Sequence, residues 1–325
     1  MAQNTIYHFV DNGAGWLLRL KQRWDSKLLV PERRPLVIIP GYGMNSFIFG
    51  WHPNNLSMEE YLVSKGFEVW SADLRGQGHS LRRGGSSLYH FKDIAVGDLK
   101  AVFRGVLENT KTTADKVDPV GCSLGGTYVI IHAALMKDAP FGTITAMGAP
   151  LRWGVVNPAL RIAFKSPLLA SLIPFGYTRQ LASLLFPLLL KAPKLLEIYM
   201  HADIVDTSDL VTLLQTVDDP NRHLNEDVAW WVKRKDVVID GVNISEEWRN
   251  VTNPFICLIG NADGIVPEDS ALAALELSGA PAYKKKLLRI GDDKLKFAHA
   301  DLFVSTPAPR MVFEPLAAAL QSFYE

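Results

Sequence analysis

The sequence predicts an α/β protein in which a mostly parallel sheet carries helices on both faces. Short apolar runs rich in β-branched residues, of which Leu36–Ile39 is the clearest, are typical of strands that are covered on both sides. Helical patterns alternate with these runs, as the crossovers between parallel strands require. A third observation is one long insertion, residues 151–235, which breaks the alternation and is far longer than an ordinary connection.

The chain is expected to open with an antiparallel hairpin, because residues 7–10 and 16–21 alternate apolar and polar side chains around a turn at 11–13. Later strands are expected at 36–39, 67–72, 117–120, 143–147, 255–259 and 286–290. Pro119 fits its strand poorly, since a proline cannot donate to a central ladder. Helices are expected from a capping box at 57–60 to Gly66, at 93–109, from Ser123 to about 137, and at 314–323.

The insertion divides the predicted fold into three parts. Residues 1–150 and 236–325 form the two parts of a sheet-containing core, and residues 151–235 form a helical cap between the sixth and seventh strands. The stretch 151–201 is rich in Leu, Ile, Phe and Pro, which predicts several short helices over one edge of the sheet. With 325 residues, 48% of them apolar, the chain is long enough to bury a large core.

Charge and cysteine content exclude several classes of function. Lys and Arg together number 34, as do Asp and Glu, so no net charge favours nucleic acid as a partner. Cys122 and Cys257 fall on predicted interior strands, which indicates core side chains rather than a disulfide. No metal and no cofactor are expected, because the chain has no His-Glu-x-x-His helix and no Gly-x-Gly-x-x-Gly turn after its first parallel strand.

The chain is expected to be a cytoplasmic protein. Its first four residues, Met-Ala-Gln-Asn, lack the basic and apolar parts of a signal peptide. The most apolar region, 167–190, contains residues that interrupt a membrane-spanning helix, so no transmembrane span is expected. These residues are Pro174, Gly176, Arg179 and Pro187.

A Gly-x-Ser-x-Gly sequence, Gly121-Cys122-Ser123-Leu124-Gly125, stands between a predicted strand and a predicted helix. In that context the serine lies at a tight, strained bend with its hydroxyl exposed, and the glycines let the flanking backbones approach each other. An ordinary connection in which the serine only caps the helix is the alternative. Cys122 would point the opposite way and is not expected to be a nucleophile.

Three side chains are expected to meet at the carboxyl edge of the sheet, where parallel α/β sheets bind ligands. Ser123, Asp263 and His299 each follow a predicted strand, in that chain order. An imidazole activates a serine hydroxyl for attack on an acyl carbon, and a carboxylate holds the imidazole in the required tautomer. Asp263 could instead be a turn residue, and His299 is one of eight histidines. Asp301 is expected to cap or line the helix after His299.

A developing oxyanion needs two backbone N–H donors. The N–H of Leu124, directly after the nucleophile, is expected to be one of them. The other is expected from Tyr42, in the loop after the strand Leu36–Ile39, where Gly41 and Gly43 would let the backbone lie close to the substrate. A plain turn is the alternative for this loop.

Together these residues resemble the α/β-hydrolase fold family over nearly the whole chain outside the cap. The matching motifs are Pro40-Gly41-Tyr42-Gly43, residues 73–80 (Asp-Leu-Arg-Gly-Gln-Gly-His-Ser), 121–126, 263–267 (Asp-Gly-Ile-Val-Pro) and His299-Ala300-Asp301. Within the family the chain is most similar to the acid-lipase-like and polyhydroxyalkanoate-synthase-like branch. The synthases carry cysteine where this chain has Ser123, which argues against polymer synthesis, and many lipases have histidine where it has Pro40.

The expected function is hydrolysis of a carboxylic ester through an acyl-enzyme on Ser123. The apolar cap predicts a small substrate with a hydrophobic acyl or ring portion. Acyl transfer to an alcohol or thiol and thioester hydrolysis would use the same triad. A catalytically silent ligand-binding protein is the alternative of a different class. The apolar stretch 184–190 also predicts weak contact with lipid surfaces.

Overall fold

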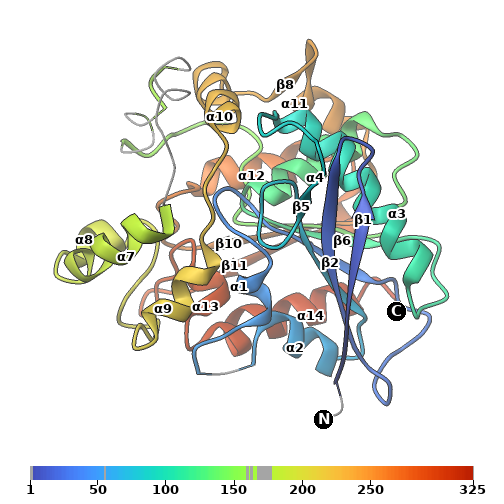
Figure 1. Cartoon of the computed structure of the whole chain (residues 1–325), viewed down its shortest axis with the longest axis horizontal. Helices are drawn as coiled ribbons and strands as arrows, with labels where there is room; N and C mark the ends of the chain where they lie inside the picture. Colours follow the sequence, from blue (N-terminus) through green and yellow to red (C-terminus); the bar gives the residue numbers. More distant parts are fainter. Residues whose placement is uncertain (1–2, 55, 159–160, 162–163, 167–177, 325) are drawn as a thin grey trace.

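A central sheet organises the computed structural model, which describes residues 3–54, 56–158, 161, 164–166 and 178–324 (Figure 1). Its nine described strands are β1 (Gln3–Asp11), β2 (Trp16–Asp25), β3 (Leu36–Ile39), β4 (Val69–Asp73), β5 (Leu81–Arg82), β6 (Asp118–Cys122), β7 (Ile144–Met147), β10 (Phe255–Gly260) and β11 (Lys285–Ile290). Their order is β1-β2-β4-β3-β6-β7-β10-β11, with β5 paired to β2. The strands from β4 to β11 run parallel and β1–β2 is an antiparallel hairpin, so the predicted fold class is confirmed.

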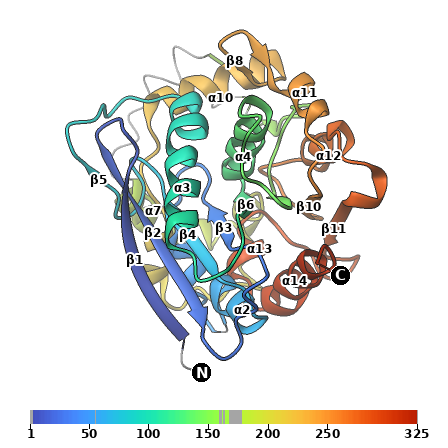
Figure 2. The same cartoon turned by 90° about the vertical axis from the view of Figure 1, so that its right-hand side faces the viewer.

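Helices cover both faces of this sheet (Figure 2). One face is covered by α3 (Leu99–Asn109), α4 (Leu124–Leu135), α11 (Ile244–Glu247) and α12 (Glu268–Leu277). The other face is covered by α1 (Phe47–Gly50), α2 (Met58–Ser64), α13 (Asp301–Val304) and α14 (Glu314–Gln321). Shorter helical turns are η1 (Asp93–Asp98), η3 (Trp248–Asn250), η4 (Ala282–Lys284) and η5 (Pro309–Phe313).

Strand β3 shows why the interior strands are apolar throughout. Leu36 and Ile38 belong to the core on one face of the sheet, whereas Val37 and Ile39 belong to the core on the other. All four side chains are fully buried. A strand that alternates between two covered faces has no solvent-facing position, and its sequence is therefore continuously apolar.

Pro119 lies inside β6 without breaking the sheet. The N–H of Asp118 bonds to the carbonyl of Pro35 on the β3 side, so the nitrogen of Pro119 faces β7. On that side the ladder begins only at Val120, which pairs with Thr145. The proline therefore occupies a position where no ladder donor is needed, which explains why the strand tolerates it.

The predicted capping box is present at the start of α2. The Ser57 hydroxyl accepts the N–H of Glu60, and the Glu60 carboxylate accepts the N–H of Ser57. The helix predicted at 93–109 is also present, but its first part, η1, is a π-helical stretch that continues directly into α3.

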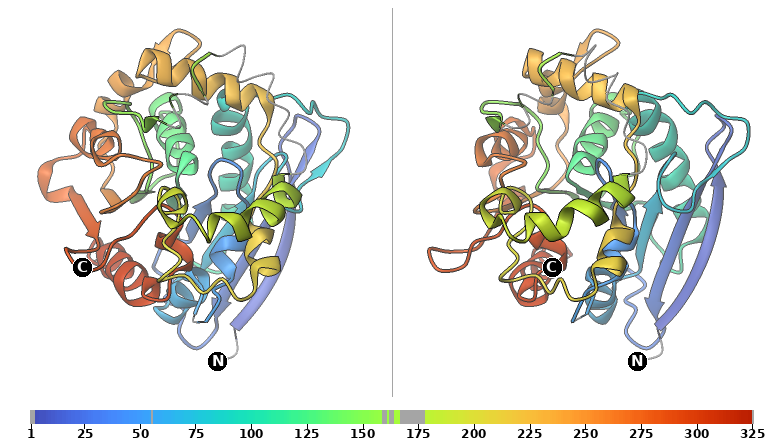
Figure 3. Two further views of the ribbon diagram at one scale, coloured as in Figure 1. Left: turned by 90° about the vertical axis from the view of Figure 1, so that its left-hand side faces the viewer. Right: turned by 60° about the vertical axis from the view of Figure 1, so that its left-hand side comes forward.

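In the described part of the chain, the named elements of the long insertion are helices, joined by loops (Figure 3). Its elements are α7 (Thr178–Leu189), α8 (Pro193–Leu196), α9 (Leu210–Leu213), η2 (Leu214–Thr216) and α10 (Arg222–Arg234). A two-stranded hairpin, β8 (Val238–Ile239) and β9 (Val242–Asn243), follows and was not predicted. The apolar stretch 167–177 lies outside the described residues, and none of the described helices has the length and apolarity needed to traverse a bilayer.

Candidate active site

Ser123 lies at the turn between β6 and α4. Its backbone has φ +54° and ψ −129°, a conformation that residues with side chains rarely adopt. The Ser123 side chain makes no capping hydrogen bond to α4, so the alternative of a simple helix cap does not hold. The tight bend that the sequence predicted is therefore present, and its strain is stored at a single serine.

The two glycines of the pentapeptide are needed for close backbone contact. A Cβ on Gly121 would lie 2.3 Å from the Cα of Gly126, inside the turn itself. A Cβ on Gly125 would lie 2.3 Å from the carbonyl oxygen of Ile39 on the neighbouring strand. Both distances are shorter than real carbon contacts, so only glycine fits either position.

The side chains of Ser123, His299 and Asp263 form one hydrogen-bonded chain. The distance from His299 Nε2 to Ser123 Oγ is 2.9 Å, and the distance from His299 Nδ1 to Asp263 Oδ2 is 2.7 Å. With its proton on Nδ1, the imidazole donates to the carboxylate and accepts from the serine hydroxyl. The structure thus brings together three residues that are as many as 176 positions apart in the sequence.

Asp263 is held rigidly by its own loop. Its second oxygen, Oδ1, accepts the N–H groups of Ile265 at 2.9 Å and Val266 at 2.8 Å. Its side chain is 3% exposed and that of His299 is 8% exposed, so solvent hardly competes for the bond between them. The turn chemistry predicted for Asp263 and its contact with His299 therefore coexist on different oxygens of one carboxylate.

The loop after β3 lies directly against the Ser123 turn. A Cβ on Gly41 would lie 2.7 Å from the Cβ of Ser123 and 2.9 Å from the nitrogen of Leu124. Leu124 is the first residue of α4, so its N–H has no carbonyl partner within the helix. The peptide N–H groups of Tyr42 and Leu124 are thus placed near Ser123, and their role as oxyanion donors remains a prediction.

Comparison with known proteins matches residues 36–293 to the model of the alpha/beta hydrolase family. This range includes β3, the Ser123 turn and Asp263, and it ends before His299. The chain belongs to the alpha/beta hydrolase family. No significant match was found among proteins with curated functions.

Solved structures of hydrolases share this fold. An esterase from Exiguobacterium antarcticum aligns with a TM-score of 0.63 and 15% identity over 97% of this chain and 100% of its own. The 2-hydroxy-6-oxo-6-phenylhexa-2,4-dienoate hydrolase from Rhodococcus sp. strain RHA1 gives 0.62 and 15% over 99% of both chains. A thermophilic esterase from Thermogutta terrifontis gives 0.62 and 13% over 99% of this chain and 100% of its own. These likenesses show the fold.

The side chain of Gln77 holds the loop after β3 in place through hydrogen bonds. Its side-chain Nε2 donates to the carbonyl of Gly41 at 2.9 Å, while its Oε1 accepts the N–H of Leu74 at 3.1 Å. Gln77 belongs to the motif at 73–80, which the sequence matched to the family without assigning it a task. A contact between two loops has no periodic signature, so sequence reasoning had no signal from which to find it.

The insertion reaches the same loop through Tyr42. The Tyr42 hydroxyl donates to Oδ1 of Asn225 on α10, and the ring packs edge-on against Phe164. Burial raises the pKa of Tyr42, so the phenol stays protonated and can donate. The amide nitrogen of Asn225 is buried without a hydrogen-bond partner in the described part of the chain. The side chain of Tyr42 therefore joins the loop to the insertion, a contact that the sequence did not predict.

Asp301 is the first residue of α13 and not its cap, which is Ala300, so of the two predicted positions it has the one that lines the helix. Its fully buried carboxylate instead pairs with Nδ1 of His201 at 2.7 Å and accepts the N–H of Ala298 at 2.7 Å. Burial raises the pKa of Asp301, and the bonds from His201 partly offset this. The pair fastens the insertion beside His299.

Other parts of the insertion cover the loops that carry the acid and the histidine. A Cβ on Gly264 would lie 2.7 Å from the Cα of Ile198, and Asn157 donates to the carbonyl of Gly264 at 2.7 Å. The Tyr199 ring lies 6.3 Å from the His299 ring. Water therefore has restricted access to the imidazole from this side.

Neither cysteine belongs to the site. Cys122 precedes Ser123 but is fully buried, and burial raises its thiol pKa well above the usual value, so the reactive thiolate is disfavoured. Among the described residues, no group of His, Cys, Asp and Glu side chains converges as a metal site requires.

Proposed function

We propose that this protein is a serine hydrolase that cleaves a carboxylic ester through an acyl-enzyme. Ser123 is the nucleophile, His299 the general base and acid, and Asp263 the residue that orients His299. The observation that carries the proposal is the continuous hydrogen-bonded chain from Ser123 Oγ through the imidazole to a buried carboxylate.

The arrangement supports both halves of ester hydrolysis. His299 Nε2 takes the proton of Ser123 as Oγ bonds to the ester carbon, and the carbonyl oxygen becomes an oxyanion stabilised by the N–H groups of Tyr42 and Leu124. The tetrahedral intermediate collapses, and the leaving alcohol receives the proton from His299. Water then gives a proton to His299 as it attacks the acyl carbon. The second tetrahedral intermediate collapses, His299 returns the proton to Ser123 Oγ, and the acid is released.

We also propose that residues 151–235 act as a cap that supplies the apolar part of the substrate site. Tyr42 packs with Phe164 and Val228 of the insertion directly beside the loop after β3. Apolar side chains at this position favour an ester with a hydrophobic acyl or ring portion. The relatives named above include a hydrolase whose name contains a phenyl-bearing substrate, which is consistent with a ring portion here.

The test is covalent labelling with a fluorophosphonate probe combined with p-nitrophenyl esters of graded chain length. We expect the full chain to be labelled at Ser123 and to hydrolyse at least one ester of the series. Ser123→Ala should abolish both signals, whereas Ser208→Ala, at an exposed serine of the insertion, should change neither. A Ser123→Ala protein that retained its ester activity would refute the proposed nucleophile.

Acyl transfer and thioester hydrolysis are alternatives on the same residues. Adding an alcohol or a thiol to the esterase assay detects acyl transfer, because a transferase forms the new ester or thioester in preference to the free acid. Thioester hydrolysis is detected by comparing a thioester with the oxygen ester of the same acid as substrates. A folded protein that is neither labelled nor active on any ester would favour the third alternative, a ligand-binding protein.

A further inference from the structure

The helices α7 and α8 expose an unusually large apolar surface, which we call the leucine face. They project from the body of the molecule (Figure 1). Within α7 the buried side chain is Phe186. The leucines of the face are all exposed: Leu181, Leu184, Leu185, Leu188, Leu190 and Leu195.

The spacing of these leucines is that of one helix side. Leu181, Leu184, Leu185 and Leu188 are separated by three, one and three residues, which places them together along α7. An amphipathic helix normally turns such a stripe towards the core. Here Leu184 is 72% exposed and Leu188 is 59% exposed, so the stripe faces outward. An outward apolar stripe of this size indicates a surface that binds another protein, a membrane or a ligand.

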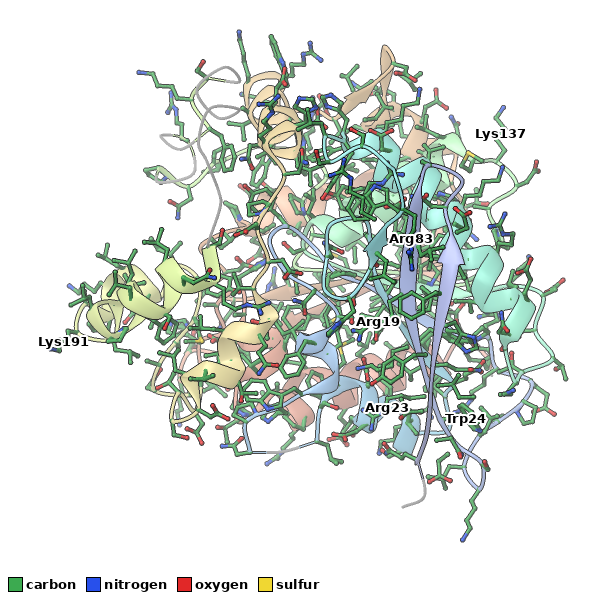
Figure 4. All side chains as sticks on the ribbon, in the orientation of Figure 1. Arg19, Arg23, Trp24, Arg83, Lys137 and Lys191 are labelled. Carbon is green, nitrogen blue, oxygen red and sulfur yellow. The ribbon has the colours of Figure 1, made fainter. Side chains whose placement is uncertain are left out.

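The exposed charges beside the leucine face are mostly positive along the chain. Residues 151–196 contain six Lys or Arg and no Asp or Glu, although the whole chain has equal numbers of both kinds. Lys191 and Lys194, beside the leucines, are exposed, and Figure 4 shows Lys191 at the outer end of the two helices. Glu197 follows α8, and Asp218 pairs with Arg179 at the start of α7. A partner that covers this face therefore meets apolar side chains and two exposed cations, Lys191 and Lys194.

We propose that the leucine face binds the surface of an anionic lipid bilayer, with the leucines among the acyl chains and Lys191 and Lys194 at the headgroups. Helices that lie in a bilayer interface combine these same two features. A symmetric contact between two copies of the chain is less compatible, because it would bring the exposed Lys191 and Lys194 of both copies together. The proposal concerns membrane binding and does not depend on the proposed ester hydrolysis.

The experiment is co-sedimentation of the full chain with vesicles of phosphatidylcholine alone or with one quarter phosphatidylglycerol. We expect binding to the anionic vesicles, at least tenfold weaker binding to the neutral ones, and weakening by added salt. Leu184→Gln/Leu188→Gln should reduce binding to anionic vesicles at least tenfold. The matched control Leu28→Gln/Leu81→Gln changes two exposed leucines outside the insertion and should leave binding to anionic vesicles unchanged.

Charge is tested separately with Lys191→Glu/Lys194→Glu, which should lose the preference for anionic vesicles. Ser123→Ala should bind as the parent does, so failure of the proposed chemistry and failure of this proposal are distinguishable. Absence of vesicle binding by the folded parent would overturn the proposal. A parent dimer that sediments as a monomer after Leu184→Gln/Leu188→Gln, without vesicle binding, would assign the face to a second copy instead.

Discussion

Gln77 holds the loop after β3 by a side-chain hydrogen bond and is not itself one of the three triad residues. Its amide nitrogen donates to the carbonyl of Gly41 at 2.9 Å. In a trans peptide the carbonyl of Gly41 and the N–H of Tyr42 point in opposite directions, so holding one fixes the other. Gln77 is therefore a positioning residue for the N–H that we assign to the oxyanion.

We predict that Gln77→Glu lowers kcat by about 10- to 100-fold with little change in KM, because loss of one well-placed oxyanion donor costs about 100- to 1000-fold. A glutamate at this position repels the Gly41 carbonyl rather than donating to it. Binding of an alkyl boronic acid, whose tetrahedral adduct places an oxygen in the oxyanion site, should weaken in parallel.

Gln321→Glu is the matched control, since Gln321 also donates to a backbone carbonyl, that of Lys65 at 3.4 Å, but at a remote exposed position. We expect it to leave kcat and boronate binding unchanged. Equal loss of ester affinity and boronate affinity in Gln77→Glu would show that Gln77 supports the fold and not the oxyanion.

Two histidine–aspartate pairs of equal length allow catalysis and stability to be separated. Asp263 bonds to His299 and Asp301 bonds to His201, each at 2.7 Å. We predict that Asp263→Asn lowers kcat by about 10⁴-fold, as expected when the imidazole takes the wrong tautomer. Asp301→Asn should instead lower the free energy of unfolding by about 1–3 kcal/mol, because a buried acceptor is lost.

Denaturant unfolding and steady-state kinetics of both variants decide the matter. If Asp301→Asn reduced kcat as strongly as Asp263→Asn in the folded protein, His201 and Asp301 would belong to the reaction rather than to the attachment of the insertion. The sequence predicted the pair at Asp263 because both members follow strands. It missed the pair at Asp301 because His201 lies in a helical insertion with no such positional constraint.

At the scale of elements, the strand–turn–helix at Ser123 depends on glycine at specific positions. We predict that Gly125→Ala destabilises the protein by about 1–3 kcal/mol, since its Cβ would meet the Ile39 carbonyl at 2.3 Å and overpacking of this kind forces the backbone to shift. Gly154→Ala is the control, because the nearest atom to its Cβ is 3.8 Å away. Thermal unfolding of both variants measures the difference, and equal melting temperatures would contradict the steric argument.

Elements that bury a whole stripe were predictable, and those defined by a few side chains were less so. The strands around Leu36–Ile39 and the hairpin of β1 and β2 follow from periodicity over several residues. The two-residue strand β5 is too short to show any period. The β8–β9 hairpin did have a signal, the turn sequence Asp240-Gly241 between Ile239 and Val242, and both turn residues have the positive φ that such turns require.

In the candidate site, too, the sequence predicted only the features that follow from the regular arrangement of the strands. Ser123, Asp263 and His299 were predictable because the loops after parallel strands all lie at one edge of the sheet. The contacts of Gln77 with Gly41 and of Tyr42 with Asn225 join segments 36 and 183 residues apart. They depend on how loops and insertion pack, which no local pattern encodes.

At the scale of the whole molecule, different groups of side chains lie at the two ends of the parallel strands. Ser123, Asp263 and His299 lie beyond the carboxyl ends of β6, β10 and β11. At the opposite edge, Asp118 begins β6 and its buried carboxylate accepts from Arg34 at 2.6 Å and from the Tyr324 hydroxyl. This cluster connects the end of the chain to the starts of the central strands. It lies at the amino ends of the strands, whereas the residues of the proposed chemistry lie at the carboxyl ends.

Tyr324→Phe should therefore lower stability without lowering activity. Loss of the hydroxyl leaves Asp118 Oδ2 without that donor and removes the bond from the Arg34 N–H, at a cost of about 1–3 kcal/mol in the free energy of unfolding. The ring itself remains beneath the Arg34 guanidinium, 4.4 Å from its centroid, so packing is largely kept. Tyr283→Phe, at a tyrosine that is 79% exposed, should have no effect on stability.

Urea unfolding supplies the free energies and ester hydrolysis in the absence of urea supplies kcat. A fall in kcat for fully folded Tyr324→Phe would mean that the two edges are coupled through β6, so that Ser123 responds to the contacts that hold Asp118.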